Sequence, residues 1–325
     1  MEQSKKVAKG LSIYPLKLIF AKYRLSFFTG RLLRTIWRGG TVLILVLSGG
    51  GLWSAAGVGA AAALRDMDIR VEGYVGTSAG AWVAAALAAG RSPEWLSQAA
   101  ASLNAGDFRL DWHSWIREAL RGRAPLSLFD GSALSRRLAF LWQGMSWETL
   151  NAPLWVTVTS LARRRVVVFG SYAPPQLGEG PGDLVWGGCD IDLMTALQAS
   201  VAVPGLFPPV VVGGDWFVDG GVGDDYPLDV ATWVGASHLV GVWVDESPTW
   251  SWPRRYHGGH VMTAALEAMI RQLTLARQRL IHVPRVDVRI QMDGGHRIFG
   301  RVAEIIQRGY DATWASEEQI RGILR

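Results

Sequence analysis

The sequence predicts an α/β fold in which a parallel sheet carries helices on its faces. Residues 41–47 form a short β-branched and leucine-rich run, TVLILVL, typical of a strand buried on both faces. Residues 55–64 are small and alanine-rich, as expected of a helix packed closely on a sheet. The next unit repeats this order, with a strand at 69–76 and a helix at 79–90. Two strand–turn–helix units in succession indicate parallel strands joined by helices.

The first of these units could also be interpreted as a membrane helix. From Thr41 the chain carries no charge until Arg65, and about 20 apolar residues are enough to cross a bilayer. A two-span alternative would use residues 41–64 and 74–90. However, three glycines follow one another at 49–51, and glycine loses the most backbone entropy in a helix. We therefore expect a strand, a glycine loop and a helix.

Length, charge and cysteine content exclude several classes of protein. The 325 residues can bury a large core, as one large domain or two ordinary ones. The single cysteine, Cys189, excludes an internal disulfide and a cysteine-based metal site. The net charge is +5, but residues 1–40 carry +8 and the remainder carries −3. Nucleic-acid binding requires a basic stripe on the folded domain, so we expect no nucleic-acid partner.

The basic N-terminal segment, residues 1–40, is predicted to be separate from the domain at 41–325. Its cations alternate with aliphatic and aromatic residues, without the long apolar stretch and small-residue cleavage site of a signal peptide. This pattern is typical of an amphipathic anchor at a membrane surface. A disordered leader, or upstream sequence from a wrong start codon, is the alternative. We expect a cytoplasmic protein peripherally associated with membranes, and delivery to a target membrane stays open.

A serine motif joins the second strand to its helix. Residues 76–80 read GTSAG, a G-x-S-x-G pattern that presents Ser78 on a sharp turn, where Gly76 and Gly80 avoid clashes. The helix N-terminus favours developing negative charge. Ser78 is therefore a candidate nucleophile, with a plain helix cap as the alternative. An attacking serine needs an oxyanion hole, and the loop of Gly49, Gly50 and Gly51 follows the neighbouring strand.

The base that would activate Ser78 has two kinds of candidate. The histidine candidates, none in an evident motif, are His238, His257, His260, His282 and His296. Asp219, in contrast, ends a short strand, WFV, and precedes the turn at Gly220 and Gly221. A carboxylate presented at that position indicates a catalytic role.

Four segments, taken in order, resemble the patatin-like phospholipases. They are SGGGLWSAAGVG at 48–59, GTSAG at 76–80, ASVAVPGLFPPV at 199–210 and VDGG at 218–221. Residues 127–142, 153–161 and 302–315 are similar to the family's connecting helix, central strand and C-terminal helix. The resemblance covers residues 41–325. It implies a three-layer α/β/α fold with a mostly parallel central sheet, and hydrolysis of lipid esters by a Ser–Asp dyad without histidine.

The resemblance also implies a mechanism without a cofactor or metal. Ser78 would attack the acyl carbonyl, Asp219 would accept its proton, and the glycine loop would hold the oxyanion until an acyl-serine forms. A free carboxyl has a pKa near 4, so the site must desolvate Asp219 to make it a base. The acidic stretches at 187–192 and 223–229 lack the ligand spacing of a calcium loop. We interpret both as solvated turns.

The chain departs from the family pattern beside the glycine loop. The family usually has Arg or Lys two residues after the triplet, followed by Gly, whereas this chain has Trp53 and Ser54. Trp53 is therefore a candidate substrate contact. The departure leaves three lipid classes open: phospholipids, lysophospholipids and neutral glycerolipids. It also leaves open a lipid-binding protein without activity, and the histidines leave open a Ser–His–Asp esterase.

Tryptophan is abundant, with sixteen residues in the chain. Several cluster between the predicted nucleophile and the central strand, at positions 95, 112, 115, 142 and 147. Because tryptophan is usually largely buried, we expect most of them in the core. The alternative is an acyl-chain channel or a rim that faces a membrane, where indole is favoured.

Overall fold

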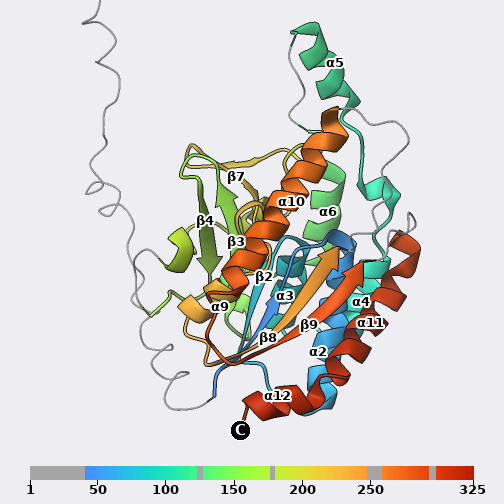
Figure 1. The fold of residues 1–325 in the computed structure, drawn as a ribbon. Coiled ribbons are helices and arrows are strands. Elements are labelled where there is room, and N and C mark those ends of the chain that lie inside the picture. The colour runs from blue at the N-terminus through green and yellow to red at the C-terminus, as the bar shows by residue number, and fades with distance from the viewer. Residues whose placement is uncertain (1–40, 123–126, 176–179, 247–257, 293–297) are drawn as a thin grey trace, which may run out of the picture. The chain divides into compact units, whose positions relative to one another are not determined.

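The computed structural model describes residues 41–122, 127–175, 180–246, 258–292 and 298–325 (Figure 1). Within these residues, nine strands form one sheet in which the order is β5-β4-β3-β2-β1-β8-β9, and the β6–β7 hairpin joins it beside β3. The strands are β1 Leu43–Leu47, β2 Gly73–Thr77, β3 Leu154–Ser160, β4 Arg165–Gly170, β5 Val185–Gly188, β6 Val210–Val212, β7 Asp215–Asp219, β8 His238–Glu246 and β9 Arg285–Met292.

The centre of the sheet is parallel. Strands β3, β2, β1, β8 and β9 all pair in parallel, and β1 lies in the middle with every residue buried. Strands β4 and β7 run antiparallel to β3. The carboxyl ends of the parallel strands therefore meet at one edge of the sheet, which we call the carboxyl edge. This arrangement confirms the predicted mostly parallel sheet.

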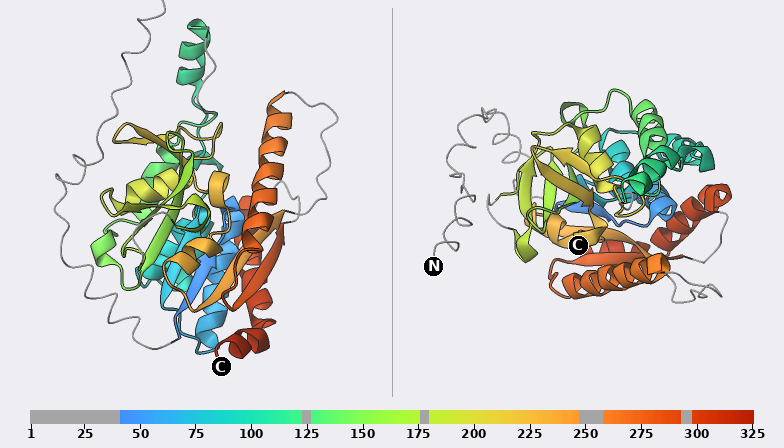
Figure 2. Two further views of the ribbon diagram at one scale, coloured as in Figure 1. Left: turned by 60° about the vertical axis from the view of Figure 1, so that its left-hand side comes forward. Right: turned by 90° about the horizontal axis from the view of Figure 1, so that it is seen from above.

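Helices cover both faces of the sheet (Figures 1 and 2). One face carries α2 Ala56–Asp66, α3 Ala79–Ala88, α4 Pro93–Ala101, α7 Leu193–Ser200, α11 Val302–Trp314 and α12 Glu317–Ile323. The other carries α8 Gly221–Asp224, α9 Leu228–Trp233 and α10 Gly258–Gln278. Helix α6 Ser132–Leu141 follows α5 Trp112–Leu120, which projects beyond the carboxyl edge (Figure 1). The predicted three-layer α/β/α fold is confirmed.

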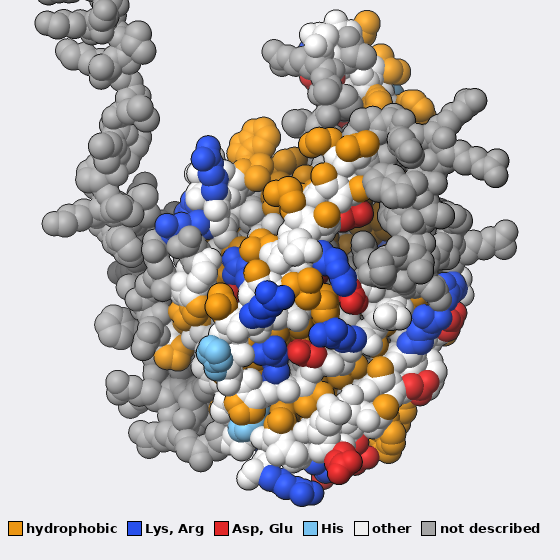
Figure 3. Space-filling model, in the orientation of Figure 1, with side chains coloured by type: hydrophobic (Ala, Val, Ile, Leu, Met, Phe, Trp, Pro, Cys, Tyr) orange, Lys and Arg blue, Asp and Glu red, His pale blue; other side chains and the backbone are white. Residues whose placement is uncertain are grey.

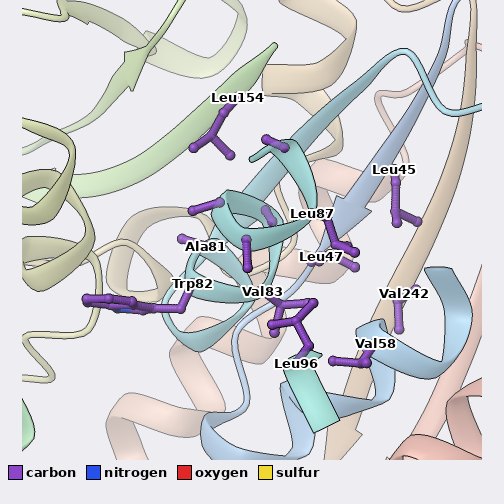
Figure 4. Close-up of a cluster of buried hydrophobic side chains, with 14 of the residues drawn as sticks. Leu45, Leu47, Val58, Ala81, Trp82, Val83, Leu87, Leu96, Leu154 and Val242 are labelled. Atoms are coloured by element: carbon purple, nitrogen blue, oxygen red, sulfur yellow. The ribbon is translucent and has the colours of Figure 1, made fainter. Parts of the chain in front are cut away.

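The main core lies between the sheet and α2, α3 and α4. Leu45, Leu47, Val58, Trp82 and Leu96 pack together there (Figure 4). Close packing depends on small residues where α2 crosses α11. A Cβ at Gly59 would lie 1.9 Å from a backbone oxygen of α11, and a Cβ at Gly309 would lie 2.0 Å from a backbone oxygen of α2. The alanine- and glycine-rich composition of α2 is therefore a requirement of helix–helix contact.

The apolar stretch at 41–64 folds as predicted, into β1, a glycine turn and a helix. A short 3₁₀ helix, Gly51–Ala55, connects the turn to α2. Among the described helices, none combines the length and apolar character that a bilayer span requires. The second predicted strand begins later than expected, at Gly73, because a turn with Asp68 at φ 58° ends α2 and delays the return to the sheet.

The predicted N-terminal anchor, residues 1–40, lies outside the described residues. Its boundary with the domain at 41–325 therefore stays a prediction.

Candidate active site

Ser78 and Asp219 meet at the carboxyl edge because two strands approach each other along the same side of β3. Strand β2 ends at Thr77, which lies opposite Thr157 of β3, and β7 ends at Asp219, which lies opposite Val158. The residue after β2 is therefore brought beside the last residue of β7. The Ser78 hydroxyl donates a hydrogen bond of 2.7 Å to Asp219 Oδ2. The structure thus brings together the two residues that the sequence predicted as nucleophile and base.

Ser78 adopts a strained backbone conformation between β2 and α3. Its φ of 54° and ψ of −132° lie in a region that residues other than glycine rarely adopt. The turn is possible because its flanking glycines approach backbone closely: a Cβ at Gly80 would lie 2.4 Å from Ser48 O, and one at Gly76 would lie 2.6 Å from Ala81 Cα. This geometry presents the hydroxyl at the N-terminus of α3, as the G-x-S-x-G pattern predicts.

Ser200 stabilises this turn, although sequence reasoning assigned it no role. The Ser78 N–H donates to Ser200 Oγ at 2.8 Å, and the Ser200 hydroxyl donates to Thr157 O at 2.8 Å. The hydroxyl therefore connects the strained residue to the central strand. Ser200 ends α7 within the segment 199–210 that carries the family resemblance, and that position was the available signal.

The Asp219 carboxyl is buried, and its pKa lies near neutral pH. The residue is only 5% exposed. Burial raises the pKa of Asp219 to about 7, while hydrogen bonds from the Ser78 hydroxyl and the Gly221 N–H act in the opposite direction. Gly220 is required because a Cβ there would lie 2.4 Å from Thr157 O. The desolvation that a carboxyl base needs is present.

The three glycines of the triplet differ in whether their N–H groups are available to an oxyanion. The Gly49 N–H donates to Asp225 O at 3.0 Å, so it is not available to an oxyanion, contrary to the expectation for all three residues. Gly49 must be glycine because a Cβ would lie 2.3 Å from Asp225 Oδ1. Gly50 and Gly51 have φ values of 131° and 57°, and neither N–H has a hydrogen-bond partner among the described residues. Both glycines line the same cleft as Ser78.

This cleft has a volume of about 560 Å³ and lies between the carboxyl edge and α10. Ser78, Asp219, Gly50 and Gly51 are among the residues that line it. The walls include apolar side chains of the 203–206 loop and of α10, namely Val203, Leu206, Leu266 and Ile270. They also include the charged side chains Asp225, Asp245, Glu267 and Arg271. The lining of the cleft is therefore mainly apolar, with charged side chains among the residues of its walls.

Trp53 does not contact this cleft, contrary to the expectation that it binds substrate. Its side chain is buried, and Arg301 and Arg308 each lie 5.6 Å from its ring. These arginines belong to the turn before α11 and to α11 itself, so Trp53 packs between the glycine loop and that helix. Ser54 is also buried and donates to Ser48 O at 3.2 Å. Both departures from the family pattern therefore stabilise the back of the loop.

The acidic stretch at 223–229 is not the solvated turn that we expected. Asp224 and Asp229 are both buried, because α8 and α9 lie beneath α10. Asp229 pairs with Arg277 of α10. Neither carboxylate oxygen of Asp224 has a hydrogen-bond partner among the described residues. Burial, and then the charge of Asp229, raise the pKa of Asp224 well above its ordinary value. Among the described residues, no three His, Cys, Asp or Glu side chains form a group that could hold a metal ion.

The histidine candidates whose side chains the structure describes lie away from the site. His238 begins β8 and contacts the Ser237 hydroxyl through Nδ1 at 2.9 Å, and His282 is exposed just before β9. Both therefore lie at the edge of the sheet opposite to Ser78. His257 and His296 lie outside the described residues, and only the backbone of His260 is described. The direct hydrogen bond between Ser78 and Asp219 leaves no room for an imidazole between them.

Comparison with known proteins identifies the family. A family model described as patatin-like phospholipase matches residues 45–232, more than half of the chain. The chain belongs to the patatin-like phospholipase family. Membership is consistent with lipid acyl hydrolase activity.

Curated relatives of this patatin-like chain are much longer than the matched region. Patatin-like phospholipase domain-containing protein 7 of Rattus norvegicus is 26% identical over 206 residues, which cover 62% of this chain and 14% of that protein. An uncharacterized NTE family protein of Mycobacterium tuberculosis is 30% identical over 195 residues, covering 59% of this chain and 28% of that protein. Among solved structures, VipD from Legionella pneumophila aligns with a TM-score of 0.49 and 14% identity, over 86% of this chain and 67% of that one.

Proposed function

We propose that this protein is a lipid acyl hydrolase that cleaves fatty-acyl esters through an acyl-serine intermediate, with Ser78 as nucleophile and Asp219 as base. The observation that carries the proposal is the 2.7 Å hydrogen bond from the Ser78 hydroxyl to Asp219, beside two glycine N–H groups in an apolar cleft. This direct contact favours a dyad over a Ser–His–Asp triad. It also gives the chain the two groups that ester hydrolysis needs, a nucleophile and a base in contact.

The first step transfers the Ser78 proton to Asp219 Oδ2 as the serine oxygen attacks the acyl carbonyl. Because the pKa of Asp219 is about 7, a large fraction of the carboxyl is ionised at neutral pH, and it binds a proton more readily than an ordinary carboxyl. The N–H groups of Gly50 and Gly51 are the donors for the developing oxyanion. The positive end of α3 adds to this stabilisation.

The second step returns the proton and completes the cycle. Collapse of the tetrahedral intermediate breaks the ester bond, and the leaving alcohol takes the proton held by Asp219. A water molecule then attacks the acyl-serine and gives a proton to Asp219. When the second tetrahedral intermediate collapses, that proton passes to Ser78 Oγ, the fatty acid leaves, and the site is restored.

The walls of the cleft fit an acyl chain rather than a polar substrate. Val203, Leu206 and Ile270 lie along it. The position where relatives usually carry a cation is occupied by Trp53, which faces away from the cleft. We therefore propose phospholipids, lysophospholipids and neutral glycerolipids as the substrates to compare. We further propose peripheral association with a membrane, where such substrates are found, with residues 1–40 as an additional anchor.

The experiment that tests this function measures fatty-acid release from mixed micelles of phospholipid, lysophospholipid and diacylglycerol in the presence of EDTA. Ser78→Ala and Asp219→Asn should each lower the rate by about 10³-fold or more, because each removes a reacting group. Ser97→Ala and Asp190→Asn make the same chemical changes away from the site and should retain the wild-type rate.

Two outcomes would contradict the proposal in different ways. If the wild type binds the micelles and releases no fatty acid from any lipid, the chain is a lipid-binding protein. If Ser78→Ala is inactive while Asp219→Asn keeps its rate, a residue other than Asp219 is the base.

A further inference from the structure

The carboxyl edge carries large apolar side chains that the catalytic proposal does not use. We propose that these side chains, which surround the mouth of the cleft, form a surface that docks on a lipid bilayer, with α5 inserted at the boundary between headgroups and acyl chains. We call this surface the apolar rim, and its main members are Trp112, Ile116, Leu120, Trp216, Met262 and Met269. The inference rests on the proposed function, because a hydrolase of lipid esters needs the mouth of its cleft to face lipid.

Helix α5 has the pattern of an interfacial helix. Trp112, Ile116 and Leu120 are spaced four residues apart and are 63%, 59% and 84% exposed. They therefore form one apolar stripe, while Arg117 lies on another face and Arg121 follows the end of the helix. Large apolar residues on a soluble helix are normally turned toward a core. A helix with Trp and Leu on one side and Arg on the other is typical of segments that lie in the membrane interface.

The base of α5 is attached to the wall of the cleft. Leu128 N–H donates to Gly205 O at 2.8 Å, and Phe129 N–H donates to Leu206 O at 2.9 Å. The Trp115 indole N–H donates to Ser127 O at 3.1 Å, which ties the helix to this ladder. Since Leu206 lines the cleft, a bilayer that holds α5 would lie directly over the cleft mouth.

The rest of the rim comes from segments that extend beyond the same edge. Val261, Met262 and Met269 of α10 are exposed, and the same helix lines the cleft through Leu266 and Ile270. On the other side, the tip of the β6–β7 hairpin exposes Trp216, which accepts a hydrogen bond from the Leu161 N–H through its backbone oxygen. Figure 3 shows hydrophobic side chains gathered along α5 and around the upper end of α10.

The charges beside the rim match a membrane surface better than a protein partner. Arg163 and Arg164 lie in the turn between β3 and β4, next to the exposed Leu161. Arg163 lies 3.5 Å from Asp215 at the start of β7, so the turn sits beside the hairpin tip. Cations next to inserted apolar residues are attracted to anionic headgroups. Tryptophan is also favoured at the headgroup level. The occupant that fits this combination is a bilayer containing anionic lipid.

The test uses the full-length chain carrying Ser78→Ala, so that vesicle lipids are not consumed during binding. Binding to vesicles of phosphatidylcholine and phosphatidylserine is measured by flotation for this protein and for the added triple change Trp112→Gln, Ile116→Gln and Leu120→Gln. The triple variant should bind at least about tenfold more weakly, because three inserted side chains are lost. The matched control is Leu280→Gln with Trp314→Gln, which changes exposed apolar residues at the opposite edge and should bind as before.

A second variant tests the charge of the turn. Arg163→Gln with Arg164→Gln should weaken binding to the anionic vesicles by roughly fivefold per cation, and should leave binding to pure phosphatidylcholine vesicles unchanged. Thermal unfolding of every variant reports whether the fold is intact. Hydrolysis of a soluble short-chain ester, measured with Ser78 restored, should be unaffected by the α5 changes.

The outcomes separate the docking surface from the catalytic proposal. A wild type that cleaves no ester, together with loss of vesicle binding in the α5 variant, would refute the hydrolase and support the docking surface. An α5 variant that binds vesicles like its parent would overturn the docking surface, whatever the activity. Equal loss in the opposite-edge control would also overturn it. So would a change from dimer to monomer without a change in vesicle binding, because the rim would then be a contact between two copies of the chain.

Discussion

Two buried aspartates, Asp219 and Asp224, lie five residues apart, and they differ in the features that lead us to propose Asp219 alone as the base. Burial is the largest cause of the raised pKa in both. Asp219 accepts hydrogen bonds from the Ser78 hydroxyl and the Gly221 N–H, and it lines the cleft. Neither oxygen of Asp224 has such a donor among the described residues, and Asp224 does not line the cleft. A raised pKa alone therefore does not distinguish the two carboxyls; our proposal of Asp219 as the base rests on the Ser78 hydrogen bond and on access to the cleft.

The surroundings of Asp224 indicate a structural role instead. Asp229 of α9 pairs with Arg277 of α10, and both side chains are largely buried. Such a pair contributes little net stability by itself, but removing one partner leaves a buried charge without compensation. The cluster therefore holds α10 against α8 and α9, and α10 in turn forms a wall of the cleft.

The largest expected difference between the two aspartates is in activity. Asp219→Asn keeps the shape of the side chain and removes the proposed base, so the hydrolysis rate should fall by about 10³-fold or more. Asp224→Asn makes the same change beneath the site and should keep the rate within about threefold, since no step uses it. Parallel measurement of kcat and KM on one lipid substrate checks this. A similar loss in both variants would mean that the buried cluster, rather than the contact with Ser78, controls the reaction.

The pH dependence sharpens the same comparison. In the proposed mechanism ionised Asp219 is the reactive form, so kcat/KM should reach a plateau above the pKa of about 7 and fall about tenfold per pH unit below it. At pH 5 the rate should be roughly a hundredfold lower than on the plateau. Asp224→Asn should leave this profile in place, because its carboxyl does not exchange a proton with substrate. A wild-type profile that is flat between pH 5 and 8 would exclude a base with this pKa.

The parts of the site that could be predicted depend on short-range constraints. Ser78 and Asp219 each follow a short strand and lie beside glycines, and these local patterns suffice to find them. The first two strand–turn–helix units are also local. Their sequence predicts parallel pairing, which the register of Leu45 opposite Tyr74 confirms. The prediction that Ser78 and Asp219 lie together came from the family resemblance, since 141 residues separate them.

The parts that could not be predicted depend on contacts between distant segments. Trp53 borders the glycine loop in sequence, but arginines some 250 residues later cover its ring, so it faces away from the cleft. Ser200 reaches Ser78 across 122 residues. The acidic stretch at 223–229 was interpreted as a solvated turn because it lacks the ligand spacing of a calcium loop. The burial of Asp229 depends on its ion pair with Arg277, 48 residues away.

The smallest expected effect is on the free energy of unfolding, and its direction should be the same for Asn variants of the two aspartates. Unfolded Asp219 has an ordinary pKa near 4, whereas folded Asp219 has a pKa of about 7. Between these values the folded state holds a proton that the unfolded state has released, so wild-type stability falls as pH rises and levels off above about 7. Asn is neutral throughout and avoids this loss. Between pH 5 and 8, Asp219→Asn should therefore gain about 2–3 kcal/mol relative to wild type, or about 5 °C in Tm.

Asp224→Asn should also gain stability relative to wild type as pH rises, because the pKa of that carboxyl is raised as well. The two variants should then differ in activity: Asp219→Asn should be more stable and inactive, while Asp224→Asn should be more stable and active. Scanning calorimetry across this pH range, with activity measured on the same samples, checks both. If Asp219→Asn shows no pH-dependent gain, the carboxyl is not desolvated in the folded protein, and its strength as a base would have to come from somewhere other than burial.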